Sequence, residues 1–313
     1  MVTKVHLDAL KSELASVEAL LARIGARDIL SRISLSQRLE ALRQEIASHE
    51  MEGNTTAGVA LIFDGDPVHG SSSIDAEFAG KTLQHYQELI SRQVAHSAGM
   101  LGERGPIPTE AQEAAKMNIT ALVHGSFGFV LEEARADEPG MFDSPVKTAV
   151  RQISDLMVDV AAQNLQSFEQ RLEDLDFRVF NTLKKFVTVI YRSGATMRVA
   201  EKDREVRFDL VSLGRAYERL RETDVSETDE TVEGELLGLV PIQRRFEFRR
   251  IDNSEIINGR VSQILSADYI ERLEREGIMA GRQWRATIRT KIVEHPDGRH
   301  ASKSHTLVDL VQK

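Results

Sequence analysis

The chain of 313 residues is 41% hydrophobic and 28% charged, and it contains no cysteine. This length predicts about two globular domains, and the missing cysteine excludes disulfides, thiolate metal ligands and cysteine nucleophiles. The net charge of −9 is concentrated in residues 51–231, where 19 basic side chains face 30 acidic ones, and this disfavours nucleic-acid binding by that part.

The N-terminal segment gives an indication of the cellular compartment of the protein. The first 24 residues are amphipathic and carry charges throughout, so we expect no secretory signal peptide. No apolar run approaches the roughly 18 residues of a membrane span. Together with the absence of cysteine, these features favour a cytoplasmic protein that does not span a membrane.

Residues 1–50 carry two apolar runs at heptad spacing, which is typical of coiled-coil-like helices. The first run is Leu7, Leu10, Leu14, Val17, Leu21 and Ile24, and the second is Leu35, Leu39, Leu42 and Ile46. The two runs are out of register across Gly25, which predicts a hairpin of helices at about 3–24 and 28–49. Packing within the chain, as a hairpin against the body, is the favoured interpretation of these runs. The alternatives are self-association and the docking of a protein partner, with the first run as the candidate surface.

Residues 55–221 predict a central α+β domain. Its expected elements are a buried strand at 58–63, a helix at 75–98, a short helix from 109, strand structure at 118–133, helices within 145–193, a hairpin at 196–210 and a helix at 211–221. Ser144 and Pro145 form a typical helix start. Residues 222–231 are acidic and almost lack apolar side chains, which favours an interdomain linker.

Residues 232–313 predict a small β-barrel. The expected elements, in the order βββαββ, are strands at 232–240, 243–252 and 255–262, a helix at 266–276, and strands at 284–294 and 303–311 joined by a turn at 295–298. This is the element order of an OB-like barrel. An SH3-like or other small barrel fits nearly as well, because periodicity gives the order of strands and not their pairing. The fold class is therefore α+β in three parts.

Asp64, Asp66 and His69 follow the predicted strand at 58–63 and are candidate metal ligands. Carboxylates and an imidazole at a strand end can bind a divalent cation or transfer protons, which makes a metal-dependent hydrolase one hypothesis. Asp-Gly-Asp-Pro is also ordinary turn chemistry, and a turn is the favoured interpretation. No metal-binding or nucleotide-binding motif is present, and Ser126 lacks the sequence context of a hydrolase nucleophile. We expect no cofactor and lean toward a protein that is not an enzyme.

Arg245, Arg249 and Arg260 lie on the second and third predicted barrel strands. In OB-type barrels this region faces single-stranded nucleic acid. Phe246 and Phe248 alternate with the arginines, and we expect both rings to point into the barrel. The leading hypothesis is a non-enzymatic protein-interaction or assembly protein that acts through the heptad helices and the barrel. Single-stranded nucleic-acid binding by the barrel is the alternative.

Overall fold

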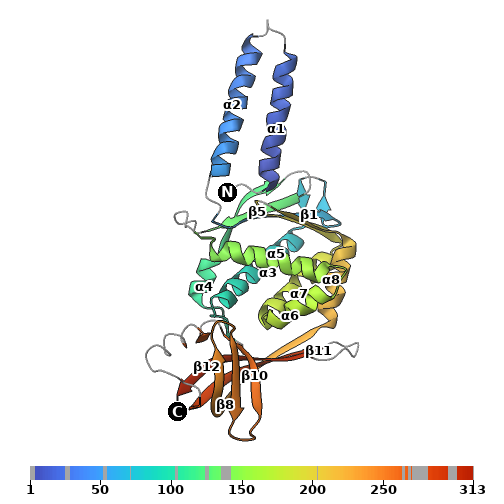
Figure 1. The fold of residues 1–313 in the computed structure, drawn as a ribbon. Coiled ribbons are helices and arrows are strands. Elements are labelled where there is room, and N and C mark those ends of the chain that lie inside the picture. The colour runs from blue at the N-terminus through green and yellow to red at the C-terminus, as the bar shows by residue number, and fades with distance from the viewer. Residues whose placement is uncertain are drawn as a thin grey trace.

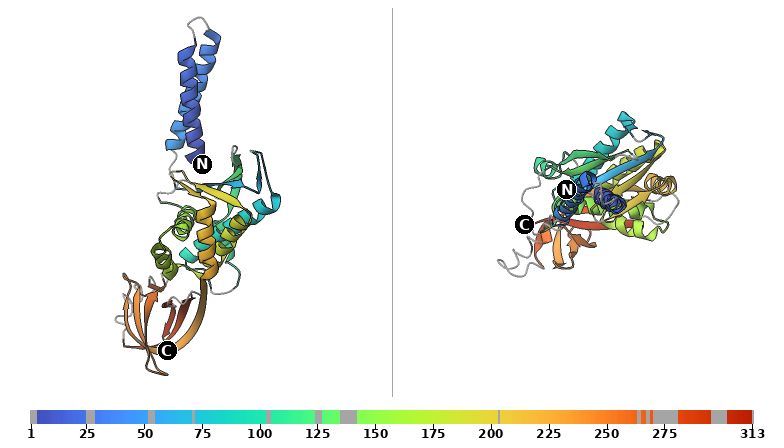
Figure 2. Two further views of the ribbon diagram at one scale, coloured as in Figure 1. Left: turned by 90° about the vertical axis from the view of Figure 1, so that its right-hand side faces the viewer. Right: turned by 90° about the horizontal axis from the view of Figure 1, so that it is seen from above.

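The computed structural model has mixed α+β structure in three parts that follow one another along the molecule (Figure 1). A pair of N-terminal helices stands at one end, a sheet with helices on one face forms the body, and a closed five-stranded barrel lies at the other end (Figure 2). No described helix is long and apolar enough to cross a bilayer. The structure describes residues 4–24, 29–51, 55–70, 72–102, 105–123, 127–134, 142–202, 204–262, 265–266, 269, 281–294 and 302–312.

The helices are α1 Lys4–Arg23, α2 Ile29–Met51, α3 Ala76–Ser97, α4 Thr109–Ala114, α5 Pro145–Ala161, α6 Gln166–Asp174, α7 Phe177–Arg192 and α8 Leu210–Glu222. The strands are β1 Gly58–Gly65, β2 Val68–His69, β3 Ser73–Ile74, β4 Met117–Val123, β5 Phe127–Glu133, β6 Ala195–Ala200, β7 Glu205–Phe208, β8 Asp224–Val240, β9 Arg245–Arg250, β10 Ile256–Val261, β11 Gln283–Glu294 and β12 Ser302–Gln312.

Helices α1 and α2 pack against each other and form a core of their own. This hairpin core consists of Leu10, Val17, Leu39, Leu42 and Ile46, with Leu14, Leu21 and Leu35 packed against it. Two ion pairs cross between the helices, Glu13–Arg38 at 2.7 Å and Glu18–Arg43 at 2.9 Å. The partner of the first heptad run within this chain is therefore the second helix.

The body is a five-stranded antiparallel sheet in the order β4-β5-β1-β6-β7. Its central strand β1 is buried from Val59 to Phe63. Val59, Leu61 and Phe63 point into the main core, which α3, α5, α7 and α8 complete, while Ala60 and Ile62 join a small cluster on the other face. This alternation follows the period of two of a strand, so the predicted buried strand is confirmed.

The helices of the body begin at side chains that accept backbone hydrogen bonds, as N-cap residues do. The Ser144 hydroxyl accepts from the amide of Lys147 at 3.0 Å, with Pro145 in the first turn of α5, as the sequence predicts. Asp75, Asp176 and Asp209 cap α3, α7 and α8 in the same way. These caps define the residues at which the four helices begin.

The acidic segment 222–231 is not an irregular linker, contrary to the prediction from its composition. It contains the last residue of α8 and the first half of β8, and only Thr223 separates the two elements. The acidic side chains are compatible with a strand because arginines on neighbouring strands pair with them, as Asp229 does with Arg289 and Glu230 with Arg250.

The barrel closes in the order β10-β12-β11-β8-β9, with β9 returning to β10. All neighbours are antiparallel except β10 and β12, which are parallel. Its core includes Phe246, Phe248 and Trp284. The predicted helix at 266–276 and turn at 295–298 lie outside the described residues, apart from the buried, helical Ser266 and Tyr269.

Strands β8 and β11 extend beyond the barrel as a two-stranded ribbon that enters the body (Figure 2). Val225 and Val293 are partners across this ribbon, and both belong to the main core of the body. Further along the same strands, Val232 and Trp284 belong to the barrel core. The two strands are therefore shared by two hydrophobic cores.

Candidate functional site

The outer wall of the barrel carries the three arginines that the sequence analysis selected. Side chains alternate along β9, so Phe246 and Phe248 are buried inside while Arg245 and Arg249 are exposed outside. Arg260 is exposed on β10. The predicted inward orientation of both phenylalanines is confirmed, and the arginines share one wall of the barrel.

Arg245 and Arg260 lie directly opposite each other across the β9–β10 pair. Like charges at such opposed positions destabilise a sheet unless something compensates them. The neighbouring Arg244 has a positive φ of 52° and donates from its Nε to the Val261 carbonyl at 3.0 Å. Arg245 and Arg260 therefore lie next to each other at this end of the wall, and Glu247, two residues along β9, is exposed on the same face.

Other arginines on and near this wall form ion pairs with carboxylates. Arg249 bonds to Glu235 at 3.1 Å, and Arg285 bonds to Glu233 at 3.3 Å. Arg250 bonds to both Asp252 and Glu230, and the hydrogen bonds to these carboxylates raise the pKa of its guanidinium. Of the three predicted nucleic-acid ligands, Arg249 is thus held by a carboxylate, and the structure brings Arg245 and Arg260 together.

Aromatic rings do not contribute to this wall. Nucleic-acid-binding barrels usually stack bases on exposed aromatic side chains. The tryptophan and phenylalanine rings of the described barrel strands, in Phe246, Phe248 and Trp284, are all buried in the barrel core. The wall can therefore attract phosphate by charge, but it offers no stacking platform on β9 or β10.

A second group of ionisable residues lies where the ribbon meets the body. Glu227 and Lys291 are partners across the ribbon, on the same face as Val225 and Val293. The ammonium of Lys291 is buried and donates to the carbonyls of Leu172 and Leu175, at the end of α6. Cations are favourable at a helix C-terminus, so Lys291 fastens the ribbon to that helix.

The Glu227 carboxylate accepts from the amide of Phe177 at 3.3 Å, next to Asp176 at the start of α7. Burial and the negative charge of Asp176 raise the pKa of Glu227 to about 7, against the opposing effect of Lys291 and Arg289. Perturbed ionisable groups often mark functional sites, but they also occur in structural networks. Here Glu227 and Lys291 connect the ribbon to the end of α6 and the start of α7 in the body.

His96, at the end of α3, faces the same junction, with its Nδ1 3.7 Å from the Asp176 carboxylate. Burial lowers the pKa of His96, and Lys291, Arg289 and Arg244 lower it further, while Asp176 opposes the shift. No sequence pattern predicted this junction cluster. Its one visible signal was the acidic composition of residues 222–231, which favoured a linker.

The candidate metal ligands Asp64, Asp66 and His69 are all exposed, at the end of β1 and in the turn and short strand that follow. Asp64 accepts a hydrogen bond from the neighbouring Gly65 amide at 2.8 Å. A depression of about 300 Å³ between β1, β6 and β7 includes Asp64 but neither Asp66 nor His69. Within the described residues no three His, Asp or Glu side chains form a metal-binding group. The metal site stays a prediction.

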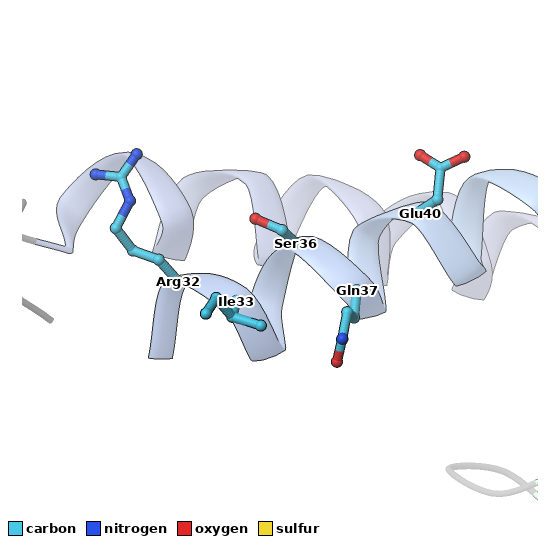
Figure 3. A pocket seen from close by; sticks show the side chains of 5 residues that line it. All are labelled: Arg32, Ile33, Ser36, Gln37 and Glu40. Carbon is cyan, nitrogen blue, oxygen red and sulfur yellow. The ribbon is translucent and has the colours of Figure 1, made fainter. Parts of the chain in front are cut away.

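The outer face of α2 carries a second depression, of about 370 Å³ (Figure 3). It is lined by Arg32, Ile33, Ser36, Gln37 and Glu40, which all lie on this one helix. Among the described residues no other element lines this depression, so the feature is an exposed helix surface and not an enclosed site. Ile33 is an exposed apolar side chain there.

Comparison with known proteins gives no relative. No family model, no curated protein and no solved structure matches the chain.

Proposed function

We propose that this chain is a non-catalytic interaction protein that engages a protein partner through its N-terminal hairpin and carries a second contact surface on its barrel. The observation that carries the proposal is the separate core of the hairpin, formed by α1 and α2 alone. Described core residues of the hairpin pack on each other and not on the main core. The hairpin is therefore not needed to complete the body.

The hairpin projects from the body, so its outer surface is accessible to a partner. At about 1.5 Å per residue, the 20 residues of α1 span about 30 Å, and the hairpin stands away from the sheet (Figure 1). The heptad residues Leu10 and Val17 are covered by α2, so self-association through them would require the hairpin to open. We therefore propose that a partner contacts the outer face of α2, around Ile33 and Gln37.

The test uses the full-length chain with the outer face altered. Ile33→Glu together with Gln37→Lys changes an exposed surface and leaves the hairpin core intact. Ala19→Glu, on the exposed side of α1, is the matched control. Proteins captured by the immobilised wild type and the control, but not by the double variant, would support the proposal if circular dichroism shows equal helix content. Identical captured sets for all three proteins would refute the placement on α2.

A second candidate function rests on the barrel. We propose that the barrel is OB-like and contacts single-stranded nucleic acid through Arg245, Arg260 and Arg249. The strand order supports an OB-like barrel, because the three successive strands β8, β9 and β10 are followed by β11 and β12 with the third and fifth strands parallel. In such barrels the second and third strands form the binding face, and these strands carry the opposed pair of Arg245 and Arg260.

Without an exposed ring on β9 or β10, the expected contact is to the phosphate backbone. Fluorescence anisotropy with a labelled single-stranded oligonucleotide should then give an affinity that falls steeply with salt. The double substitution of Arg245 and Arg260 by Ala should abolish binding, whereas Arg285→Ala, on β11, should not. No binding at low salt, where electrostatic attraction is strongest, would refute this function and leave the barrel as a protein-contact module.

A further inference from the structure

Strand β4 forms one edge of the sheet in the body and is exposed along its length. Within the described chain it pairs with β5 alone, so its other side presents backbone groups outward. Residues 118–122 are exposed, and only the two end residues are half-buried. All seven residues, Met-Asn-Ile-Thr-Ala-Leu-Val, are uncharged.

Two large apolar side chains of β4 share one face. Ile119 and Leu122 are partners of Leu131 and Phe129, which belong to the main core, so both point to the helix-covered side of the sheet. A register shift between Ile119 and Ala121 produces this spacing of three residues. Ile119 is nevertheless 54% exposed and Leu122 is 48% exposed. These two side chains therefore continue the apolar face of the sheet past the area that the helices cover.

Proteins usually protect sheet edges by making them short, charged or interrupted. The opposite edge follows this rule, because β7 has four residues and includes Glu205 and Arg207. Strand β4 has seven residues and no charge, and the irregularity near Thr120 is its one protective feature. The two edges of one sheet therefore differ in the property that prevents strand addition.

We propose that the edge of β4 is a self-association surface, on which a second copy of this chain adds its own β4 in antiparallel orientation. Strand addition of this kind uses the free backbone groups for affinity and the side chains for register. A two-fold axis within β4 would place the same neutral strand on both sides, so no like charges would face each other. The pairing would also cover Ile119 and Leu122 of both copies.

Self-pairing brings two negatively charged bodies together. Residues 51–231 carry 19 basic and 30 acidic side chains and therefore repel those of a second copy, while β4 itself adds no charge at the contact. One strand pair is smaller than the ~800 Å² per partner of a stable interface. We therefore infer a weak dimer that forms as the concentration rises, with the two sheets continuous through the paired strands.

The test measures the mass and the backbone protection of the full-length chain. Sedimentation velocity from about 1 to about 100 μM should show a monomer–dimer equilibrium, the range expected for a small interface. Hydrogen exchange over the same range should show protection that rises with concentration in residues 117–123. Ile119→Lys and Leu122→Lys should each weaken the dimer by about tenfold or more. Val211→Lys, at a site 66% exposed at the start of α8, is the control and should not.

Two outcomes would overturn the inference. One is a monomer across the whole concentration range. The other is a dimer that persists in both lysine variants or whose protected peptides lie in α1 and α2, since the contact would then be the hairpin. This inference is independent of the proposed partner site on α2, because altering Ile33 and Gln37 leaves β4 unchanged.

Discussion

Replacing Glu227 by Gln should stabilise the protein above neutral pH. In the fold the pKa of Glu227 is about 7, raised by burial and by Asp176, and its ordinary value is 4.5. The folded state therefore holds a proton between these values that the unfolded chain has lost, so stability decreases as pH rises through this window. One pKa unit corresponds to about 1.36 kcal/mol, which gives about 3 kcal/mol as an upper value. Because the side chain is only half-buried, we expect about 2 kcal/mol.

The glutamine can still accept from the Phe177 amide, so the substitution removes charge and keeps the hydrogen bond. Urea denaturation at pH 8 should show the variant more stable than the wild type, and the difference should fall below about 1 kcal/mol at pH 5. Trp284 is the one tryptophan and lies in the barrel core, so its fluorescence follows the barrel to which Glu227 belongs. Glu247→Gln, exposed on β9, should change stability by no more than about 0.5 kcal/mol. If Glu227→Gln destabilises the protein at pH 8, attraction to Lys291 outweighs burial and the reasoning is wrong.

Three further substitutions test the packing. Lys291→Met should cost about 2–3 kcal/mol, because two carbonyls at the end of α6 lose their donor, and chemical denaturation followed by circular dichroism measures it. Gly234→Ala should prevent barrel closure and shift the Trp284 emission, because a Cβ at this position would collide with the backbone of β9. Gly238 has open space around it, so Gly238→Ala should leave the stability and the Trp284 emission nearly unchanged. Leu42→Ala should lower the free energy of unfolding of the hairpin by about 2–5 kcal/mol and lower the helix content. The unfolding transition followed by Trp284 fluorescence should not shift.

Elements with a strong local pattern were predictable. The heptad runs of Leu10 and Leu39 predicted both helices of the hairpin, and Ser144 marked the start of α5, because these signals depend on residues a few positions apart. The alternation around Phe246 likewise predicted which side of β9 faces the barrel core.

Features that depend on distant partners were not predictable. The acidic half of β8 resembles a linker until Arg289, 60 residues later, pairs with Asp229. The segment 118–133 has a strand pattern interrupted by Gly125 and Gly128, which predicts a bulge or a tight turn without deciding between them. The structure contains the separate strands β4 and β5. The junction cluster required the pairing of β8 with β11 and the position of Lys291 beneath α6, and neither follows from periodicity. The opposition of Arg245 and Arg260 became visible only with the register of β9 and β10.

The ribbon of β8 and β11 also bears on how such a chain can change by recombination. A crossover at the start of the barrel would have to cut β8, a single strand of 17 residues whose two ends lie in different cores. A replacement barrel would need to bring its own matching Val225 and Lys291. A cut within β8 would therefore break both cores, whereas a cut between the hairpin and β1 would leave the hairpin core and the main core complete.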